Sequence, residues 1–258
     1  MKQKTQLKRL AGLLTLPILA TVGSGANAAE PPPAPIMETY TCSYQDGKGE
    51  KDLMAARDYY LKQADKAGIK PGASYLLSLF KGGLPFDQVW MTPHSSLSAF
   101  AAATDAEAAS ADMADVVTRF EAVVDCTANL NNLTMVFQRD GYTPDGSPGF
   151  VSGSACMARP GVGPEQIQDL TTHIADVVGS LGSKAPNAVF MMTPITQGPT
   201  SADMVLLAGF DGVSSWADFI AAIRGSSGGP MLMRHLQAVA ECDQALWYSQ
   251  RVIAPSAE

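Results

Sequence analysis

The chain has 258 residues and a formal net charge of −7, and 46% of its residues are hydrophobic. A chain of this length and composition can bury a substantial core, as one large domain or as two smaller ones. Its acidity argues against nucleic acid as a partner, because an acidic surface repels the phosphate backbone.

The N-terminal 28 residues have the pattern of a secretory signal peptide. Four basic residues come first, an apolar run covers residues 10–22, and the small residues Ala26-Asn27-Ala28 follow. An uncleaved anchor is the alternative, but the run is shorter than the ~20 apolar residues that a membrane span needs. We therefore expect cleavage at Ala28 or a neighbouring residue, and a periplasmic or secreted protein without a stable membrane span. The mature net charge is then 14 minus 25, or −11.

Residues 29–36 are rich in proline and predict an extended tether, so the fold is expected to begin near Met37. Alternating residue types around Tyr40 to Tyr44 predict a first strand. Apolar residues at helical spacing then predict a helix over residues 51–67, which Gly68 ends. Residues 73–80 and 86–92 are expected to form a β-hairpin.

Two helical segments are predicted after this hairpin. Ser95 or Ser96 is expected to cap a helix that runs through Phe100, and a second helical piece reaches Cys126. Residues 133–138 follow as a strand. The first half, residues 37–140, thus has the predicted order strand, helix, strand, strand, helix, strand. A turn-rich linker covers residues 141–149.

The second half, residues 150–254, repeats this order. Its predicted elements are a strand at 150–157, a helix from Pro164, strands at 188–193 and 203–210, and a helix from Ser215 that breaks at 225–229. The helix restarts at Pro230 and ends at Cys242, and a last strand covers 246–252. Residues 156–182 align without a gap with residues 42–68. The chain is therefore predicted to be a tandem duplication of one α+β module.

Four cysteines in an exported chain favour disulfides, and no CxxC or HxxxH motif supports metal binding instead. Four cysteines allow three pairings. Cys42 to Cys126 spans 84 positions and Cys156 to Cys242 spans 86, so one bridge inside each half is the most economical choice.

Several predicted strands, such as residues 75–80, are apolar on both faces, so both faces must be covered. Helices would cover one face and the sheet of the other half would cover the second. This predicts two four-stranded antiparallel sheets that face each other, with helices outside.

The doubled element order and the helix openings SSLSAFAAA (95–103) and SSWADFIAA (214–222) resemble the dimeric α+β barrel superfamily. The resemblance implies two ferredoxin-like βαββαβ repeats, packed sheet to sheet as a pseudo-dimeric α+β barrel within one monomeric chain. That superfamily includes cofactor-free monooxygenases, isomerases, cyclases and haem proteins such as chlorite dismutases. Its members commonly hold an apolar ligand, so the resemblance implies a small apolar molecule as the partner here.

The candidate site residues come from both halves. Haem proteins that resemble this fold take their axial histidine from a C-terminal helix, so His235 is the candidate metal ligand if haem is present. Without haem, we expect no cofactor and no metal. His235 is then a hydrogen-bonded histidine in the core or at its rim. His94 is a pocket-rim base or a surface residue, and Trp90 and Trp216 stack on a ligand or pack in the core. Arg234 flanks a glycine-rich helix start, which is either a plain helix break or a site for a carboxylate or phosphate.

Two further patterns have a plain structural explanation. His173 lies on a strongly apolar helix, so we expect a structural role at the edge of the core. Met231, Met233 and His235 are residue types that suit copper(I), but a helix would separate them, so packing is expected.

Three functions remain open on the sequence alone. The first is an exported binding protein for a small molecule, with catalysis undecided. The second is a haem-dependent or cofactor-free oxidoreductase, and the third is a structural or partner-binding module without catalysis.

Overall fold

The computed structural model describes residues 34–143, 147–196 and 202–255. The predicted signal peptide and the first residues of the proline-rich tether lie outside these ranges. Ile36, which the sequence assigns to the tether, already belongs to the first strand and is buried. The unit from Pro33 to Glu258 is described below.

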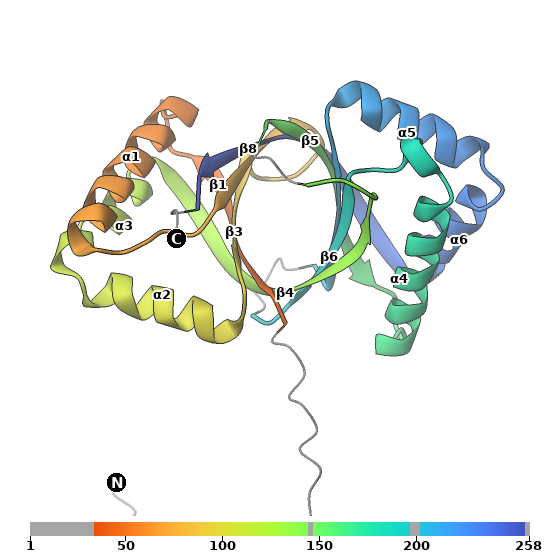
Figure 1. Ribbon diagram of the computed structural model, residues 1–258, viewed down its shortest axis with the longest axis horizontal. Helices are drawn as coiled ribbons and strands as arrows, with labels where there is room; N and C mark the ends of the chain where they lie inside the picture. The colour runs from red at the N-terminus through yellow and green to blue at the C-terminus, as the bar shows by residue number, and fades with distance from the viewer. Residues whose placement is uncertain (1–33, 144–146, 197–201, 256–258) are drawn as a thin grey trace, which may run out of the picture. The chain divides into compact units, whose positions relative to one another are not determined.

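Eight strands form one closed barrel, in the order β1-β3-β2-β8-β5-β7-β6-β4, with β4 pairing back to β1. Every neighbouring pair is antiparallel. Figure 1 shows the barrel between two groups of helices. The strands are β1 (Ile36–Tyr44), β2 (Ser74–Lys81), β3 (Gln88–His94), β4 (Val124–Gln138), β5 (Gly149–Ala158), β6 (Ala188–Pro194), β7 (Met204–Phe210) and β8 (Ala240–Ile253).

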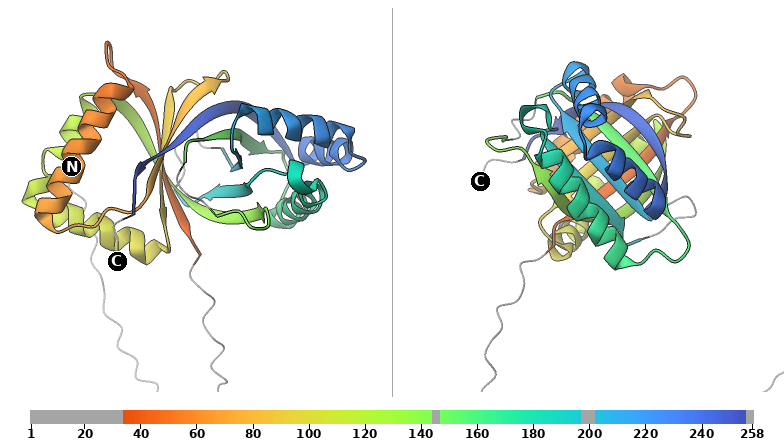
Figure 2. Two further views of the ribbon diagram at one scale, coloured as in Figure 1. Left: turned by 45° about the horizontal axis from the view of Figure 1, so that its top comes forward. Right: turned by 90° about the vertical axis from the view of Figure 1, so that its right-hand side faces the viewer.

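The helices cover the outside of the barrel in two groups, as the right-hand view of Figure 2 shows for the second group. The first group packs mainly on the strands of the first half and the second group mainly on those of the second half (Figure 1), but the end of β8 also packs with the first group and the end of β4 with the second. The first group is α1 (Glu50–Ala67), α2 (Leu97–Ala109) and α3 (Val116–Glu121), with the short turn η1 (Ala111–Met113). The second is α4 (Pro164–Gly179), α5 (Val213–Gly225) and α6 (Gly229–Val239), with the turn η2 (Gly182–Lys184).

The closed barrel corrects the expectation of two separate ferredoxin-like sheets stacked face to face. Strand β2 pairs with β8, and β4 pairs with β6, so the edges of the two halves are hydrogen-bonded to each other. An open four-stranded sheet would leave unpaired N–H and C=O groups along both edges, and closure removes them. Within each half the strand order corresponds: β4-β1-β3-β2 in the first and β8-β5-β7-β6 in the second.

Both faces of the strands are nevertheless covered by apolar groups, as their composition predicts. Leu76 is 0% exposed and packs toward the helices, whereas Leu77 is 4% exposed and belongs to a different cluster. That second cluster receives side chains from all eight strands, so it fills the barrel interior. Phe86 stacks on Trp247 there, with ring centroids 5.7 Å apart.

The helix ends follow local sequence signals. Gly68 ends α1 in the left-handed conformation, with φ of 69°, which glycine adopts without strain. Ser96 caps α2, because its hydroxyl oxygen accepts a hydrogen bond from the Ala99 N–H at 3.1 Å. Pro164 begins α4, where its missing N–H costs no hydrogen bond.

Two predicted helix ends are wrong, and both errors lie before the last strand of a half. Cys126 and Cys242 were expected to end helices, but they belong to β4 and β8. The physical reason is pairing: β4 extends along the whole of β1, and β8 along the whole of β5, so the strands begin earlier than their apolar pattern indicates.

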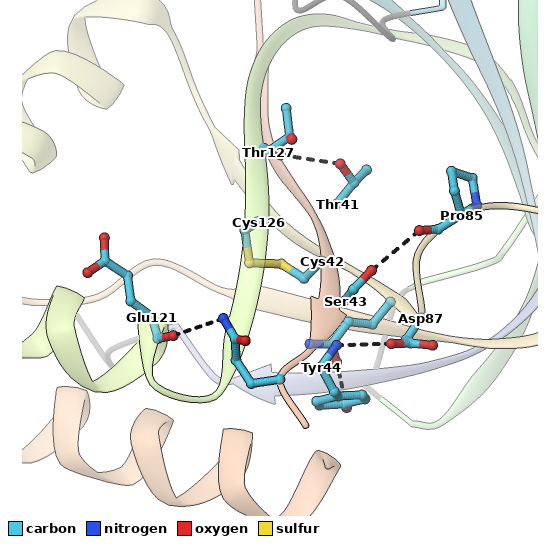
Figure 3. Close-up of a disulfide and its surroundings, with 11 residues drawn as sticks. Thr41, Cys42, Ser43, Tyr44, Pro85, Asp87, Glu121, Cys126 and Thr127 are labelled. Carbon is cyan, nitrogen blue, oxygen red and sulfur yellow. Dashed lines mark hydrogen bonds between the residues drawn. A yellow bond between two sulfur atoms is a disulfide. The ribbon is translucent and has the colours of Figure 1, made fainter. Parts of the chain in front are cut away.

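This strand extension places the cysteines opposite each other. Cys42 lies across from Cys126, and Cys156 across from Cys242, and each pair forms a disulfide. The pairing is the one that the sequence spacing favours. Figure 3 shows the first bridge between β1 and β4, close to the hydrogen bond from Tyr44 N–H to Asp87.

Candidate functional site

Five polar side chains gather between the sheet of the first half and its helices. Glu38 and Tyr40 come from β1, His94 from β3, Tyr60 from α1 and Glu107 from α2. We call this group the Glu38 cluster. Glu38 and Tyr40 are two positions apart on a strand, so both point to the same face of the sheet.

The carboxylate of Glu38 links two other members of the cluster. The Tyr40 hydroxyl donates a hydrogen bond to Oε1 of Glu38 at 2.6 Å. On its other side, Oε2 lies 3.4 Å from Nε2 of His94. The side chains of His94 and Glu38 are 13% and 22% exposed, so the contact is largely shielded from solvent.

The second contact of the cluster joins two helices. The Tyr60 hydroxyl of α1 donates a hydrogen bond to Oε1 of Glu107 on α2 at 2.8 Å. No residue of α2 is buried, and the same holds for α5 at the corresponding place in the second half. Helix α5 nevertheless packs Phe219 and Ile223 against a buried cluster, whereas α2 supplies no residue to the buried clusters of the described chain. Helix α2 therefore has less apolar packing than its counterpart.

Burial and the nearby carboxylates keep the cluster tyrosines protonated. Burial is the largest cause that raises the pKa of Tyr40, and Glu38 raises it further through its hydrogen bond and charge. Burial also raises the pKa of Tyr60, followed by the charge of Glu107 and that of Glu38. The charge of Glu107 also raises the pKa of Tyr40, as that of Glu38 raises the pKa of Tyr60. The two hydrogen-bonded pairs therefore influence each other electrostatically.

The arrangement can accept a proton from a bound molecule. When His94 donates its Nε2 proton to Glu38, its Nδ1 has a free lone pair and can accept a proton from a bound molecule. Glu38 would fix the tautomer and the orientation of the ring, while Tyr40 holds the carboxylate from the other side. A base oriented by a second polar group is a common element of catalytic sites.

Sequence reasoning found His94 in this cluster and missed the other four members. Trp90, also predicted, lies on the same face of β3 four positions before His94, but it packs edge-on against Phe120 at 6.0 Å in the core. Glu38 could have been found from the alternation of β1, which places its carboxylate on the same face as Tyr40 and Cys42, toward the helices. Nothing in the sequence indicates that Tyr60 and Glu107 meet, because this depends on how α1 and α2 pack.

The remaining predicted residues lie in the second half and do not join the Glu38 cluster. Trp216 lies 6.0 Å from the ring of Phe150, which is buried. The side chain of Arg234 is exposed on α6. Near the start of that helix, the Ser226 hydroxyl accepts a hydrogen bond from the Gly229 N–H at 2.9 Å, so this N–H already has a partner.

His235 contacts a histidine that the sequence analysis assigned a structural role. Its Nδ1 lies 3.0 Å from Nδ1 of His173 on α4. The space between these helices and the sheet is filled by a buried apolar cluster that includes Leu170, Val178 and Leu232. For His235 to bind a haem iron, His173 would have to move away from the His235 ring. The buried cluster would also have to leave space for the porphyrin. The residues present therefore do not fit a haem at this position.

A surface cavity of about 500 Å³ lies where the two halves of the chain join, next to the linker. In its lining, Asp211 accepts a hydrogen bond from Asn187 at 2.7 Å and lies 3.7 Å from Arg139, so these three groups already have partners. Its lining includes Thr143 and Ser147, which border residues outside the described ranges. We therefore assign no functional site to it.

The described residues also bear on two other kinds of feature, a membrane-spanning helix and a metal site with three or more protein ligands. Among the described residues, no helix is both long enough and apolar enough to cross a membrane. In the same part of the chain, no three histidine, cysteine, aspartate or glutamate side chains come together in a group suited to a metal ion.

Solved structures similar to this one are members of the dimeric α+β barrel superfamily. A monooxygenase candidate from Fusobacterium nucleatum is 12% identical, with a TM-score of 0.56, over 87% of this chain and 95% of that one. An anthrone oxidase-like protein is 11% identical, with a TM-score of 0.52, over 87% and 97%. A chlorite dismutase candidate is 8% identical, with a TM-score of 0.50, over 85% and 95%.

These similarities cover nearly the full length of the neighbouring chains, so the whole barrel with its helices corresponds. At such low identity they show the fold alone. No family model matches the sequence, and no curated protein matches it either.

Proposed function

We propose that the protein is an oxidoreductase that acts on a small, largely apolar molecule without a bound cofactor. The observation that carries the proposal is the contact between Glu38 and His94 in the layer between sheet and helices. It supplies an oriented base that is largely shielded from solvent, beneath the weakly packed helix α2.

The proposed reaction begins with proton abstraction by Nδ1 of His94. A suitable substrate is an aromatic compound with an acidic C–H group, because the ring stabilises the resulting carbanion. The carbanion is electron-rich enough to react with molecular oxygen. For a methylene group, one oxygen atom becomes the carbonyl oxygen and the other leaves as water, so that R₂CH₂ and O₂ give R₂C=O and H₂O.

The similarity to a monooxygenase candidate and to an anthrone oxidase-like protein is consistent with this chemistry. Anthrone-type ketones belong to the proposed substrate class, since their methylene group lies between two aromatic rings. The aromatic surroundings of the cluster, which include Phe100 at 5.4 Å from the His94 ring, would favour such a molecule.

Three further statements belong to the same proposal. The corresponding strand orders of the two halves support a duplicated module that folds as a monomeric pseudo-dimer. The two disulfides support folding in an oxidising compartment, such as the periplasm or the exterior of the cell. The signal pattern of residues 1–28 would direct the chain there.

The proposal is tested by oxygen consumption with a panel of anthrone-type and phenolic compounds. We expect uptake by the purified protein without added metal, flavin or haem. His94→Gln removes the base and should reduce the rate at least about 100-fold, the lower end of what general-base catalysis contributes. Glu38→Gln keeps the size of the side chain but removes its charge, and should reduce the rate less.

Glu165→Gln, which changes an exposed carboxylate at the start of α4, is the matched control and should leave the rate unchanged. Equal rates in the wild type and in His94→Gln would contradict the proposal. In that case the Glu38 cluster would have a structural role in joining sheet and helices.

A further inference from the structure

The contact between His173 and His235 is separate from the proposed reaction. The two residues are 62 positions apart and come from α4 and α6. Their Nδ1 atoms are 3.0 Å apart, and their ring planes are inclined by 35°. Both side chains are half-buried. Neither ring forms an ion pair with a carboxylate in the described part of the chain.

This separation suits two ligands of one metal ion. A histidine nitrogen lies about 2.0–2.1 Å from a bound zinc ion, and two such nitrogens at angles of about 90–110° are about 2.9–3.4 Å apart. The observed 3.0 Å lies inside this interval. Without a metal ion, the same distance allows one neutral ring to donate a hydrogen bond to the other.

Buried leucines next to the two histidines fix the helices that carry the rings. Leu170 lies one turn before His173 on α4 and is 1% exposed, and Leu232 lies one turn before His235 on α6 and is 6% exposed. Both leucines belong to the same buried cluster. Because the backbones are fixed by packing, little reorganisation is needed to bring the two nitrogens onto one ion.

We propose that His173 and His235 form a two-histidine binding site for a late first-row transition metal ion, such as Cu²⁺, Ni²⁺ or Zn²⁺. Imidazole nitrogen suits these ions, whereas Mg²⁺ and Ca²⁺ prefer oxygen ligands. The chain supplies two ligands, and water completes the coordination, in keeping with the absence of a third His, Cys, Asp or Glu ligand among the described residues. The bound ion would join α4 to α6.

The site differs from both earlier metal hypotheses. It uses two protein ligands on neighbouring helices and needs no space for a porphyrin. It also replaces the copper interpretation of Met231, Met233 and His235, because the nearby partner of His235 is His173 rather than a methionine on its own helix. The metal site does not depend on the proposed oxidoreductase activity, since the Glu38 cluster lies in the other half.

The test is calorimetric titration of the purified full chain with Cu²⁺, Ni²⁺, Zn²⁺ and Mg²⁺. We expect one ion per chain for the three transition metals, with Cu²⁺ the tightest, and no binding of Mg²⁺. His173→Gln and His235→Gln should each weaken binding at least about tenfold, since each removes one of the two protein ligands. The third histidine offers a matched control, and His94→Gln should bind the ions as the wild type does.

Spectroscopy provides a second measurement that identifies the ligands directly. Histidine ring resonances in the NMR spectrum of the wild type should shift on addition of Zn²⁺ for His173 and His235 but not for His94. With Cu²⁺, the electron paramagnetic resonance spectrum should show coupling to two nitrogens, and to one in His235→Gln. The proposal is overturned if the wild type binds none of the three ions, or if His173→Gln binds them as tightly as the wild type.

Discussion

The carboxylate of Glu38 lies between the Tyr40 hydroxyl and the His94 ring, and the 3.4 Å contact with His94 joins neighbouring strands β1 and β3. A carboxylate on the helix-facing side of a sheet is costly unless its oxygens have partners. Both oxygens of Glu38 have one. The contact therefore makes predictions about stability as well as about activity.

Removing either partner of the hydrogen bond between Tyr40 and Glu38 should destabilise the fold. Glu38→Ala leaves the Tyr40 hydroxyl without its acceptor, and Tyr40→Phe leaves Oε1 of Glu38 without its donor, so each should cost about 1–3 kcal/mol. Urea unfolding of the two variants and of the double variant measures these costs. Wild-type stability in both single variants would show that the hydrogen bond does not stabilise the cluster.

High pH should destabilise the protein through its buried tyrosines. The pKa values of Tyr40 and Tyr60 are raised by burial and nearby carboxylates, and burial raises the pKa of Tyr44 to about 12. In the unfolded chain these groups ionise near pH 10. Below that pH their contribution to stability is complete, and it is lost as pH rises, because only the unfolded state releases protons readily.

The measurement is the free energy of unfolding between pH 9 and pH 12. We expect a decline that becomes shallower in Tyr40→Phe and in Tyr60→Phe. Tyr248 is half-exposed on β8 rather than buried, so Tyr248→Phe is the control that should keep the slope of the wild type.

Gly229 should not tolerate a side chain. A Cβ atom at this position would lie 1.8 Å from the carbonyl oxygen of Ile223, because the backbone turns sharply between α5 and α6. Gly229→Ala should therefore destabilise the protein by at least about 1–3 kcal/mol, the cost of overpacking. At Gly225 a Cβ atom meets nothing within 4 Å, so Gly225→Ala is the matched control and should unfold near the wild-type temperature.

Each disulfide should stabilise the fold by a similar amount. The bridges close loops of 84 and 86 positions, so the chain-entropy model assigns them nearly equal contributions, and removal of a native disulfide typically costs about 2–5 kcal/mol. We expect the Cys42→Ser/Cys126→Ser and Cys156→Ser/Cys242→Ser double variants to melt at similar, lowered temperatures. A wild-type melting temperature in either variant would contradict this account.

Much of the fold could be predicted because the relevant signals are local. Gly68 ends α1 and Pro164 begins α4 through backbone preferences that a few residues determine. The disulfide pairing could be inferred from spacing. The start of β4 could not, because the segment before Cys126 has helical spacing and becomes a strand through pairing with distant β1. The pairing of edge strands that closes the barrel was not predicted for the same reason, since β2 pairs with β8 and β4 with β6 across long stretches of sequence.

The candidate sites were less predictable than the fold. His94 has the residue type of a base and was found, but its partner Glu38 lies 56 positions away on another strand. His173 was assigned a structural role because its own helix is strongly apolar, and its partner lies on α6. In both cases the chemistry depends on which elements are neighbours, and no local pattern carries that information.

The closure of the barrel also bears on how the chain acquires its structure. Strand β8 pairs with β2, and Arg251 lies across from Tyr75, so the ring of strands is incomplete until β8 has been synthesised. Long-range pairing of this kind slows folding, because the loop entropy is lost before the contacts form. A chain cut short before β8 would expose free edges of β2 and β5 and should aggregate.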